Sequence, residues 1–439
     1  MTTLRVGLIG YGMIGKVHAY CYATMPFFAP GLDVAGKIVA VATSREETAR
    51  AAQRTLNCQV ATTDFRAITE NPEIDVVHIC TPNDQHLPAL LSAIGANKHI
   101  YCEKPVVCNQ SEAEQVRAAL EEVDANGQRR YRGISQMAFH LRGFTAIQRA
   151  KELVEEGRLG QILQYRLGYY HSSMTSPSAP YRWKHSATGG SILDLASHLL
   201  DLIDYLLGLP AEVVAHANTM TLTRPQKPLQ SGEALADVAR VPVVSEDAIT
   251  ILTRGLLDSA RMIPQTQTSR NAYYEYDGNL TVANGSAHAG HMPLAVADAS
   301  SRAAVSGVIE GTKLCHGAED ELLLELNGTR GSLRFSLMSP HYLEFFDATR
   351  PAGVYGGESG WTRIPCGARY PAPQSDFPSP KSTTGWLRAH AASLATFYRS
   401  ISQGRALGPD LWQGLRVQDA LSAIAESART RERVEVKAR

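Results

Sequence analysis

The sequence has no long apolar run, no excess of one charge and no paired cysteine motif. None of its apolar stretches reaches the roughly 20 residues that span a bilayer. Basic and acidic residues each number 43, so electrostatics gives no reason to expect nucleic acid or an anionic membrane as partner. The first residues, MTTLRVGLIGYG, lack the basic and apolar regions of a signal peptide. We therefore expect a soluble, cytoplasmic protein.

Cysteine is present but never in a paired spacing. The seven cysteines include no C-x-x-C pair, and several lie in apolar stretches such as VVHIC and HIYCEKP. An odd number of cysteines without paired spacing argues against disulfides and against a zinc site. In such stretches cysteine behaves as a small hydrophobic residue. The sequence therefore predicts neither a disulfide framework nor a metal centre.

The first third of the chain alternates apolar runs with helical patterns. Strands are expected at LRVGLI, KIVAVAT, IDVVHICTP, KHIYCEKP and RRYRGISQ, with a helical pattern after each of the first four. This alternation predicts a parallel sheet with helices on both faces. We assign residues 1–137 to this domain and residues 138–439 to a second one.

A glycine-rich turn follows the first expected strand. Gly10, Gly12 and Gly15 form G-x-G-x-x-G between a strand and a helix, the context of a dinucleotide site. The glycines permit a close backbone approach to a pyrophosphate at the positive end of the helix. The ends of later strands should line the same crevice. The predicted cofactor residues are Gly10, Gly12, Met13, Ile14, Gly15, Thr43, Ser44, Arg45, Thr81, Pro82, Asn83, His86, Glu103 and Lys104.

The end of the second strand bears on the choice of nucleotide. An acidic residue there would bind the ribose hydroxyls of NAD, but this chain has Thr43, Ser44 and Arg45. Hydroxyls and a guanidinium suit a 2′-phosphate, which favours NADP over NAD. Alternatively, Arg45 is only a solvated residue in the first turn of a helix.

The stretch GGSILDLASHLLDLIDYLLG, residues 189–208, is apolar around most of a helix. Asp194, His198 and Asp201 stand at i, i+4 and i+7, which places them in one stripe. Such a stripe faces either a polar cavity or water, and an amphipathic helix with a solvated face is the other interpretation.

Three motifs in order, GYGMIG, CEKP and GGSILDLASH, resemble the Gfo/Idh/MocA family of nicotinamide-dependent oxidoreductases. TPNDQH and GTRGSLRF add to the resemblance. It implies a Rossmann domain followed by an α/β domain with a large, open, mostly antiparallel sheet, and last helices that pack back on the first domain. It also implies a homodimer or homotetramer built on the outer sheet face. The chain departs from the family pattern at Ser191 and Ala196, where glycine is usual.

The resemblance implies hydride transfer between a nicotinamide and a secondary hydroxyl of a sugar, sugar derivative or cyclitol. The family's catalytic lysine corresponds to Lys104, commonly before a cis proline, and its Asp–His pair to Asp194 and His198. An imidazole, with an intrinsic pKa of about 6.5, suits general acid/base catalysis at His198. Lys104 can stabilise a developing alkoxide, and Asp194 can orient the imidazole or bind a substrate hydroxyl.

The loop before this helix, YYHSSMTSPSAPYRWKHSATGG, has the aromatic and cationic content of a specificity loop. Trp183 in this loop either contacts a sugar or anchors the loop, and Lys184 and Arg142 are further candidate contacts. Residues 264–308 interrupt the strand pattern and are expected to cover the mouth of the site or a subunit contact. The residues predicted to contact substrate are Lys104, Gln136, His140, Arg182, Trp183, Asp194 and His198.

Two other functions remain open. Some enzymes of this fold hold NAD tightly and cleave a glycosidic bond by transient oxidation, and these accumulate no reduced cofactor. A non-catalytic nucleotide-binding protein is the third possibility, and the presence of Lys104, Asp194 and His198 argues against it.

Overall fold

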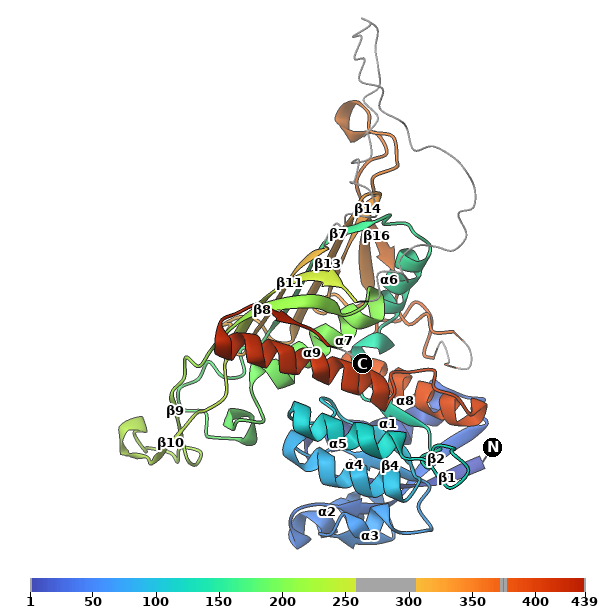
Figure 1. The fold of residues 1–439 in the computed structure, drawn as a ribbon, viewed down its shortest axis with the longest axis vertical. Helices are drawn as coiled ribbons and strands as arrows, with labels where there is room; N and C mark the ends of the chain where they lie inside the picture. Colours follow the sequence, from blue (N-terminus) through green and yellow to red (C-terminus); the bar gives the residue numbers. More distant parts are fainter. Residues whose placement is uncertain (1, 258–304, 372–373, 375–376, 438–439) are drawn as a thin grey trace, which may run out of the picture.

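A computed structural model describes residues 2–257, 305–371, 374 and 377–437 of the 439-residue chain. Two sheets are stacked along the long axis of the molecule, and the last two long helices lie between them (Figure 1). The predicted excursion at 264–308 lies almost wholly outside the described residues. Within the described ranges no helix is long and apolar enough to cross a membrane.

The first sheet has six parallel strands in the order β3-β2-β1-β4-β5-β6. This order, which reverses between β1 and β4, is that of a Rossmann fold. The strands are β1 Thr2–Ile9, β2 Val34–Ala42, β3 Val60–Thr62, β4 Val76–Ile79, β5 His99–Cys102 and β6 Ser135–Met137. The helices are α1 Met13–Phe28, α2 Glu46–Leu56, α3 Arg66–Thr69, α4 His86–Gly95 and α5 Gln110–Glu121.

The last strand of this sheet is shorter than the sequence predicts. The RRYRG part of the predicted strand lies outside β6 and is largely exposed. Its charged side chains cannot enter a buried parallel strand without loss of hydration. Pairing with β5 therefore begins only at Ser135.

The second sheet has nine strands in the order β16-β15-β14-β13-β7-β12-β11-β8-β17. Only β7 and β12 pair in parallel, so the predicted Rossmann domain with a second, mostly antiparallel sheet is confirmed. The strands are β7 Ile162–Tyr170, β8 Pro210–Asn218, β11 Ala248–Leu256, β12 Ser306–Thr312, β13 Glu321–Gly328, β14 Gly331–Ser336, β15 Tyr342–Asp347, β16 Trp361–Pro365 and β17 Val434–Glu435. A separate small hairpin joins β9 Thr223–Pro225 to β10 Arg240–Pro242.

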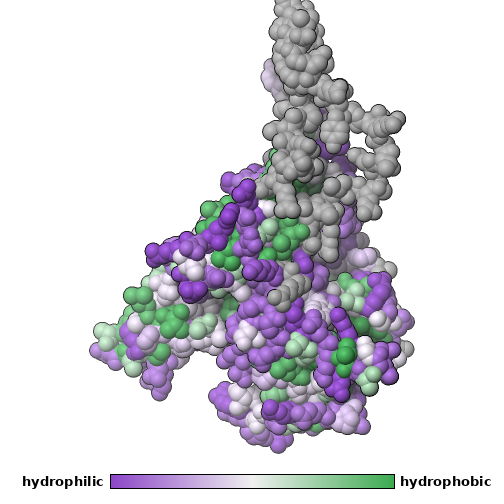
Figure 2. All heavy atoms as spheres, in the orientation of Figure 1, coloured by the Kyte–Doolittle hydropathy of each residue, from purple (hydrophilic) through white to green (hydrophobic). Residues whose placement is uncertain are grey.

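Among the described residues, helices cover one face of the large sheet, and no helix covers the other, which we call the open face. Alternate residues along β11 show this, because Ile249 and Ile251 are buried whereas Leu252 is 55% exposed. Figure 2 shows hydrophobic residues gathered among polar ones on the visible surface of this half of the molecule. The covering helices are α6 Thr145–Glu155, α7 Ser197–Leu206 and α9 Leu411–Thr430.

The last two helices connect the two domains. Helix α8, Trp386–Gln403, packs on α1 and β2, and α9 packs on α5, α7 and β8. The Arg117 guanidinium of α5 donates to both carboxylate oxygens of Asp419 in α9 at 3.0 Å. The chain therefore returns to its first domain after completing the second sheet.

Candidate active site

Three glycines bring the ends of β1, β4 and α1 together. Gly10 has a φ of 93°, and a Cβ there would lie 2.5 Å from the carbonyl oxygen of Cys80. A Cβ at Gly15 would lie 2.4 Å from the carbonyl oxygen of Gly10. Among the described residues, no side chain caps the N-terminus of α1, and no atom lies within 4 Å of the position of a Cβ at Gly12. An uncapped helix N-terminus beside open space fits a pyrophosphate.

The loops after β4 and β5 are held together by His86. Its Nδ1 lies 2.8 Å from the Pro105 carbonyl oxygen, and its Nε2 lies 3.1 Å from that of Thr81. The Asn83 side-chain amide donates to the Thr188 carbonyl at 2.7 Å. His86 and Asn83 are thus placed to hold loops, and Asn83 joins the first domain to the segment that precedes the catalytic helix.

The two charged residues of the CEKP motif have different surroundings. Glu103 is buried against His18, whereas the Lys104 ammonium lies beside Asp194. The Lys104–Pro105 bond is cis, as the resemblance implied.

The end of β2 presents exposed polar groups. Ser44 and Arg45 are exposed, and the Thr43 hydroxyl donates to the Arg45 carbonyl at 2.9 Å. The first acidic side chain after β2 is that of Glu46, which binds Arg50 at 2.8 Å. This end of the strand therefore offers hydroxyls and a guanidinium to a cofactor ribose.

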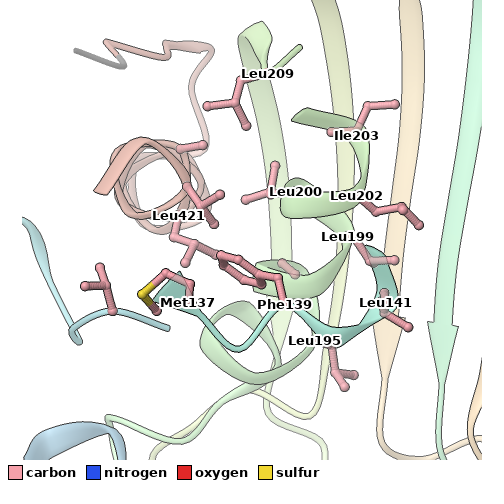
Figure 3. Close-up of a cluster of buried hydrophobic side chains, with 14 of the residues drawn as sticks. Met137, Phe139, Leu141, Leu195, Leu199, Leu200, Leu202, Ile203, Leu209 and Leu421 are labelled. Carbon is pink, nitrogen blue, oxygen red and sulfur yellow. The ribbon is translucent and has the colours of Figure 1, made fainter. Parts of the chain in front are cut away.

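The catalytic helix begins with a π-helical segment, Ile192–Ala196, which continues into α7. Figure 3 shows why this helix is apolar on most sides, with Leu200 directed toward Leu421 of α9 and Leu199 and Leu202 directed toward the strands. Such single π turns are frequent at functional sites. Asp194 lies within this turn.

The paired glycines ahead of the helix are required by close packing. A Cβ at Gly190 would lie 2.1 Å from a carboxylate oxygen of Glu246, and one at Gly189 would lie 2.4 Å from the Lys184 Cα. Glu246 accepts the N–H of Ile192 at 2.6 Å, which satisfies a donor at the helix N-terminus.

Asp194 is surrounded by three lysines. The Lys104 ammonium donates to its Oδ1 at 3.0 Å and to its carbonyl oxygen at 2.9 Å. Lys184 donates to Oδ2 at 2.8 Å, and Lys313 lies 3.3 Å from the same oxygen. Burial opposes ionisation, but the three ammonium groups outweigh it and hold the pKa of Asp194 well below its usual range. Asp194 therefore stays a carboxylate and fixes the position of the Lys104 ammonium.

His198 lies one turn further along, 6% exposed. Burial, and then the nearby Lys104 ammonium, lower its pKa well below the usual range. The sequence analysis took the ordinary value near neutrality, which ignores both effects. The imidazole is therefore neutral, and its Nδ1 has no hydrogen-bond partner among the described residues. A neutral ring can accept a proton from a hydroxyl.

The third member of the stripe does not face a cavity. Asp201 is 1% exposed and accepts hydrogen bonds from the Arg142 guanidinium at 2.6 to 3.1 Å. The helix is buried at all positions except Asp204 and Tyr205, which are half-buried. The spacing of polar residues therefore could not distinguish a face that lines a cavity from a face that forms an ion pair. Asp201 and Arg142 therefore belong to the packing of α7, and a substrate contact by Arg142 is not supported by its placement.

The other predicted substrate contacts are scattered. Gln136 is buried and its amide donates to the Ser393 carbonyl at 2.8 Å, so it contacts α8 instead of the lysine cluster. The His140 ring lies 5.2 Å from the His198 ring, which places it at the site. Arg182 and Trp183 are exposed and precede Lys184, which is the member of this loop that reaches Asp194.

Lys313 was missed by the sequence analysis. It directly follows β12, is 2% exposed, and donates to the Gly189 carbonyl at 2.8 Å. A lysine after a strand is ordinarily exposed, so only its place beside the Asp194 carboxylate reveals it.

The described residues fit a nicotinamide dinucleotide. The uncapped start of α1 and the glycine turn suit the pyrophosphate, and the exposed groups after β2 suit a ribose. Asn83 and the CEKP loop connect this crevice to the cluster formed by Lys104, Asp194 and His198.

Comparisons with known proteins agree with this fit. Three models of one family match: "Oxidoreductase family, NAD-binding Rossmann fold" at residues 4–128, "GFO/IDH/MocA C-terminal domain" at 147–287, and "Oxidoreductase family, C-terminal alpha/beta domain" at 285–436. Levoglucosan dehydrogenase of Pseudarthrobacter phenanthrenivorans is 29% identical over 98% of this chain and 97% of its own length. Inositol 2-dehydrogenase of Rhizobium meliloti is 28% identical over 64% of this chain and 73% of its own length.

Solved structures show the same fold over the whole chain. Apo levoglucosan dehydrogenase superimposes with a TM-score of 0.81 at 26% identity, covering 99% of both chains. Its complex with NADH and levoglucosan gives a TM-score of 0.79, covering 99% of this chain and 100% of that one. The chain belongs to the Gfo/Idh/MocA family of oxidoreductases, whose first domain is an NAD-binding Rossmann fold.

Proposed function

We propose that this oxidoreductase acts on a secondary hydroxyl of a sugar, with an anhydrosugar such as levoglucosan as the first candidate. The observation that carries the proposal is the convergence of Lys104, Asp194 and His198. Lys104 donates to Asp194 Oδ1 at 3.0 Å, and His198 lies one helical turn after Asp194, close enough for the Lys104 ammonium to lower its pKa. The candidate substrate comes from the relative that matches this chain over nearly its full length.

The nicotinamide cofactor, when bound, accepts or returns the hydride. The chain's own residues accept the hydroxyl proton and stabilise the negative charge that develops on the oxygen. The neutral imidazole of His198 accepts the hydroxyl proton, and the ammonium of Lys104 donates a hydrogen bond to the oxygen as negative charge develops on it. Asp194 holds Lys104 in place, and Lys184 and Lys313 keep Asp194 ionised.

A panel of sugars, anhydrosugars and cyclitols, each tested with NAD⁺ and NADP⁺, tests this proposal. We expect reduced cofactor to accumulate steadily with at least one pyranose or anhydrosugar. Cleavage of a glycoside without net accumulation of reduced cofactor would favour the alternative of an enzyme that cleaves glycosidic bonds by transient oxidation. Cofactor binding without turnover of any compound would favour the non-catalytic protein.

We also propose that the enzyme prefers NADP over NAD. It rests on exposed Ser44 and Arg45 and on the Glu46–Arg50 pair, which occupies the nearest carboxylate. Arg45→Glu is expected to lower kcat/KM for NADP⁺ by about ten- to a hundredfold, because a hydrogen bond to a charged group contributes about 1.5–3 kcal/mol. The control is Arg54→Glu, at an exposed arginine of the same helix. Equal activity of Arg45→Glu and wild type with NADP⁺ would reject the preference.

The open sheet face is the proposed contact between copies of this chain. It carries exposed Leu252, Leu323 and Val214, and a groove of about 660 Å³ crosses it. Its charges include both signs, such as Arg334 and Glu325, as a self-complementary face requires. We expect a dimer or tetramer by light scattering, and a shift toward monomer in Leu252→Glu but not in Val123→Glu, an exposed position of the first domain. A monomeric wild type would contradict this assignment.

A further inference from the structure

Three buried side chains from distant parts of the chain meet beneath the CEKP loop. They are His18 of α1, Glu103 of the loop, and His390 of α8, with exposed fractions of 3%, 7% and 2%. One ligand atom from each lies within 4.8 Å of the others. Among the described residues, the only side-chain hydrogen bond from these three to Lys104 or Asp194 is that of Glu103, which accepts the Lys104 backbone N–H.

The polar atoms that converge here lack hydrogen-bond partners. His18 Nε2 lies 2.9 Å from Glu103 Oε1, but neither atom forms a hydrogen bond of acceptable geometry among the described residues. Neither ring nitrogen of His390 has a partner there. Burial of these four polar atoms without hydrogen bonds is costly, and a further species bound between them would satisfy them.

The neighbouring contacts fix these groups in the orientation of ligands. His18 Nδ1 contacts His78 Nε2, and His78 Nδ1 lies 2.9 Å from the Tyr22 hydroxyl. A histidine that ligates a metal commonly donates its other nitrogen in this way, which leaves the lone pair of Nε2 free. Glu103 Oε2 accepts the N–H of Lys104 at 3.2 Å, which leaves Oε1 free.

His390 is held by ring packing alone. It stacks on His140 with centroids 3.9 Å apart and lies 4.3 Å from the Trp386 ring, so both nitrogen edges remain available.

We propose that His18 Nε2, Glu103 Oε1 and one ring nitrogen of His390 bind a divalent cation, with Zn²⁺ as the ion that their donor set fits best. Two imidazoles and one carboxylate are typical zinc ligands, and donors about 2.1 Å from a tetrahedral zinc lie about 3.4 Å from one another. The ion would compensate the Glu103 charge and join α1, the CEKP loop and α8. Its role is structural, since none of its three ligand atoms belongs to Lys104, Asp194 or His198.

A second group of donors nearby is a poorer candidate. His18, His78 and Cys80 also approach one another, but His18 would there use its other nitrogen. That nitrogen, His18 Nδ1, already contacts His78 Nε2. The sequence predicts no metal centre from closely spaced pairs of ligands, whereas these ligands come from positions 18, 103 and 390.

The test uses the full-length chain without a histidine tag. After dialysis against a chelator, the protein is titrated with Zn²⁺ in competition with a chromophoric chelator, and metal content is measured by mass spectrometry. We expect one tightly bound equivalent, a higher Tm with zinc, and the visible absorption bands of tetrahedral Co²⁺ when cobalt replaces zinc. His390→Ala should weaken Zn²⁺ binding by at least about tenfold. His316→Ala, at an exposed histidine, should bind as wild type does.

Wild-type protein that binds no zinc equivalent beyond weak surface sites would show that only ordered water fills the space, and would overturn the proposal. Equal zinc affinity in His390→Ala and His316→Ala would overturn it too. If His390→Ala does not fold, the stoichiometry and cobalt spectrum of the wild type decide. The outcome does not depend on the sugar substrate, because no step of the proposed reaction uses this ion.

Discussion

Replacing Lys104 with methionine is expected to lower kcat by at least about a hundredfold, the scale of lost acid/base and electrostatic help. The ammonium is the one group that Asp194 holds with both its carbonyl and its carboxylate oxygen. Methionine keeps the length of the side chain but can neither donate to the reacting oxygen nor offset its charge. Cofactor affinity should change by no more than about threefold, because the pyrophosphate meets the glycine turn instead.

Steady-state kinetics and cofactor titration measure both effects. Lys37→Met is the control, since Lys37 is an exposed lysine of β2 outside the site. With substrate deuterated at the reacting carbon, the kinetic isotope effect on kcat should be larger in Lys104→Met than in wild type, because hydride transfer becomes the slow step. Turnover within tenfold of wild type would remove Lys104 from the chemistry.

Arg142→Met should reduce the free energy of unfolding by about 3–5 kcal/mol, the usual cost of leaving one partner of a buried ion pair alone. The guanidinium is the group that offsets the Asp201 carboxylate, which is 1% exposed inside the packing of α7. Chemical denaturation measures this loss. Arg149→Met, which breaks only partly exposed pairs of α6, should cost no more than about 1 kcal/mol.

A double variant distinguishes loss of the pair from loss of packing. Arg142→Met combined with Asp201→Leu removes both charges, so it should be more stable than Arg142→Met alone. Equal stability of the single and double variants would mean that the buried charge is not the cause.

The same pair sets a pH dependence of stability. Burial raises the pKa of Asp201 to about 6 in spite of Arg142, whereas the unfolded value is about 3.9. The folded state therefore binds the Asp201 proton more tightly than the unfolded state does. The resulting contribution to the free energy of unfolding is complete below about pH 4 and is lost as the pH rises through about 6. Asp201→Asn should remove this decline, which denaturation at several pH values measures.

The sequence predicted the parts of the site that depend on local backbone constraints. Gly10 and Gly15 are needed because a Cβ would strike neighbouring backbone, and such positions appear in the sequence as glycines. The strand and helix periods placed the Rossmann sheet, and the order of motifs identified Lys104, Asp194 and His198 as one group. The structure brings these three side chains together.

What the sequence could not supply depends on packing between distant segments. Asp201 shares a helical stripe with His198, but its carboxylate forms an ion pair with Arg142, which comes from another segment. Gln136 lies at the end of the predicted first domain, yet its side chain binds α8, which comes more than 250 positions later. Lys313 has an unremarkable context in the chain and becomes a site residue only because β12 lies beside the π turn.

The central claim is that Lys104 and His198 converge on one hydroxyl beside the nicotinamide. A crystal structure of the protein with a nicotinamide cofactor and a sugar substrate tests it most directly. The account predicts a substrate hydroxyl within about 3.2 Å of both Lys104 Nζ and a ring nitrogen of His198, with its carbon facing the nicotinamide. A substrate bound with no hydroxyl between these two groups, or with His198 turned away from the cofactor, would contradict it.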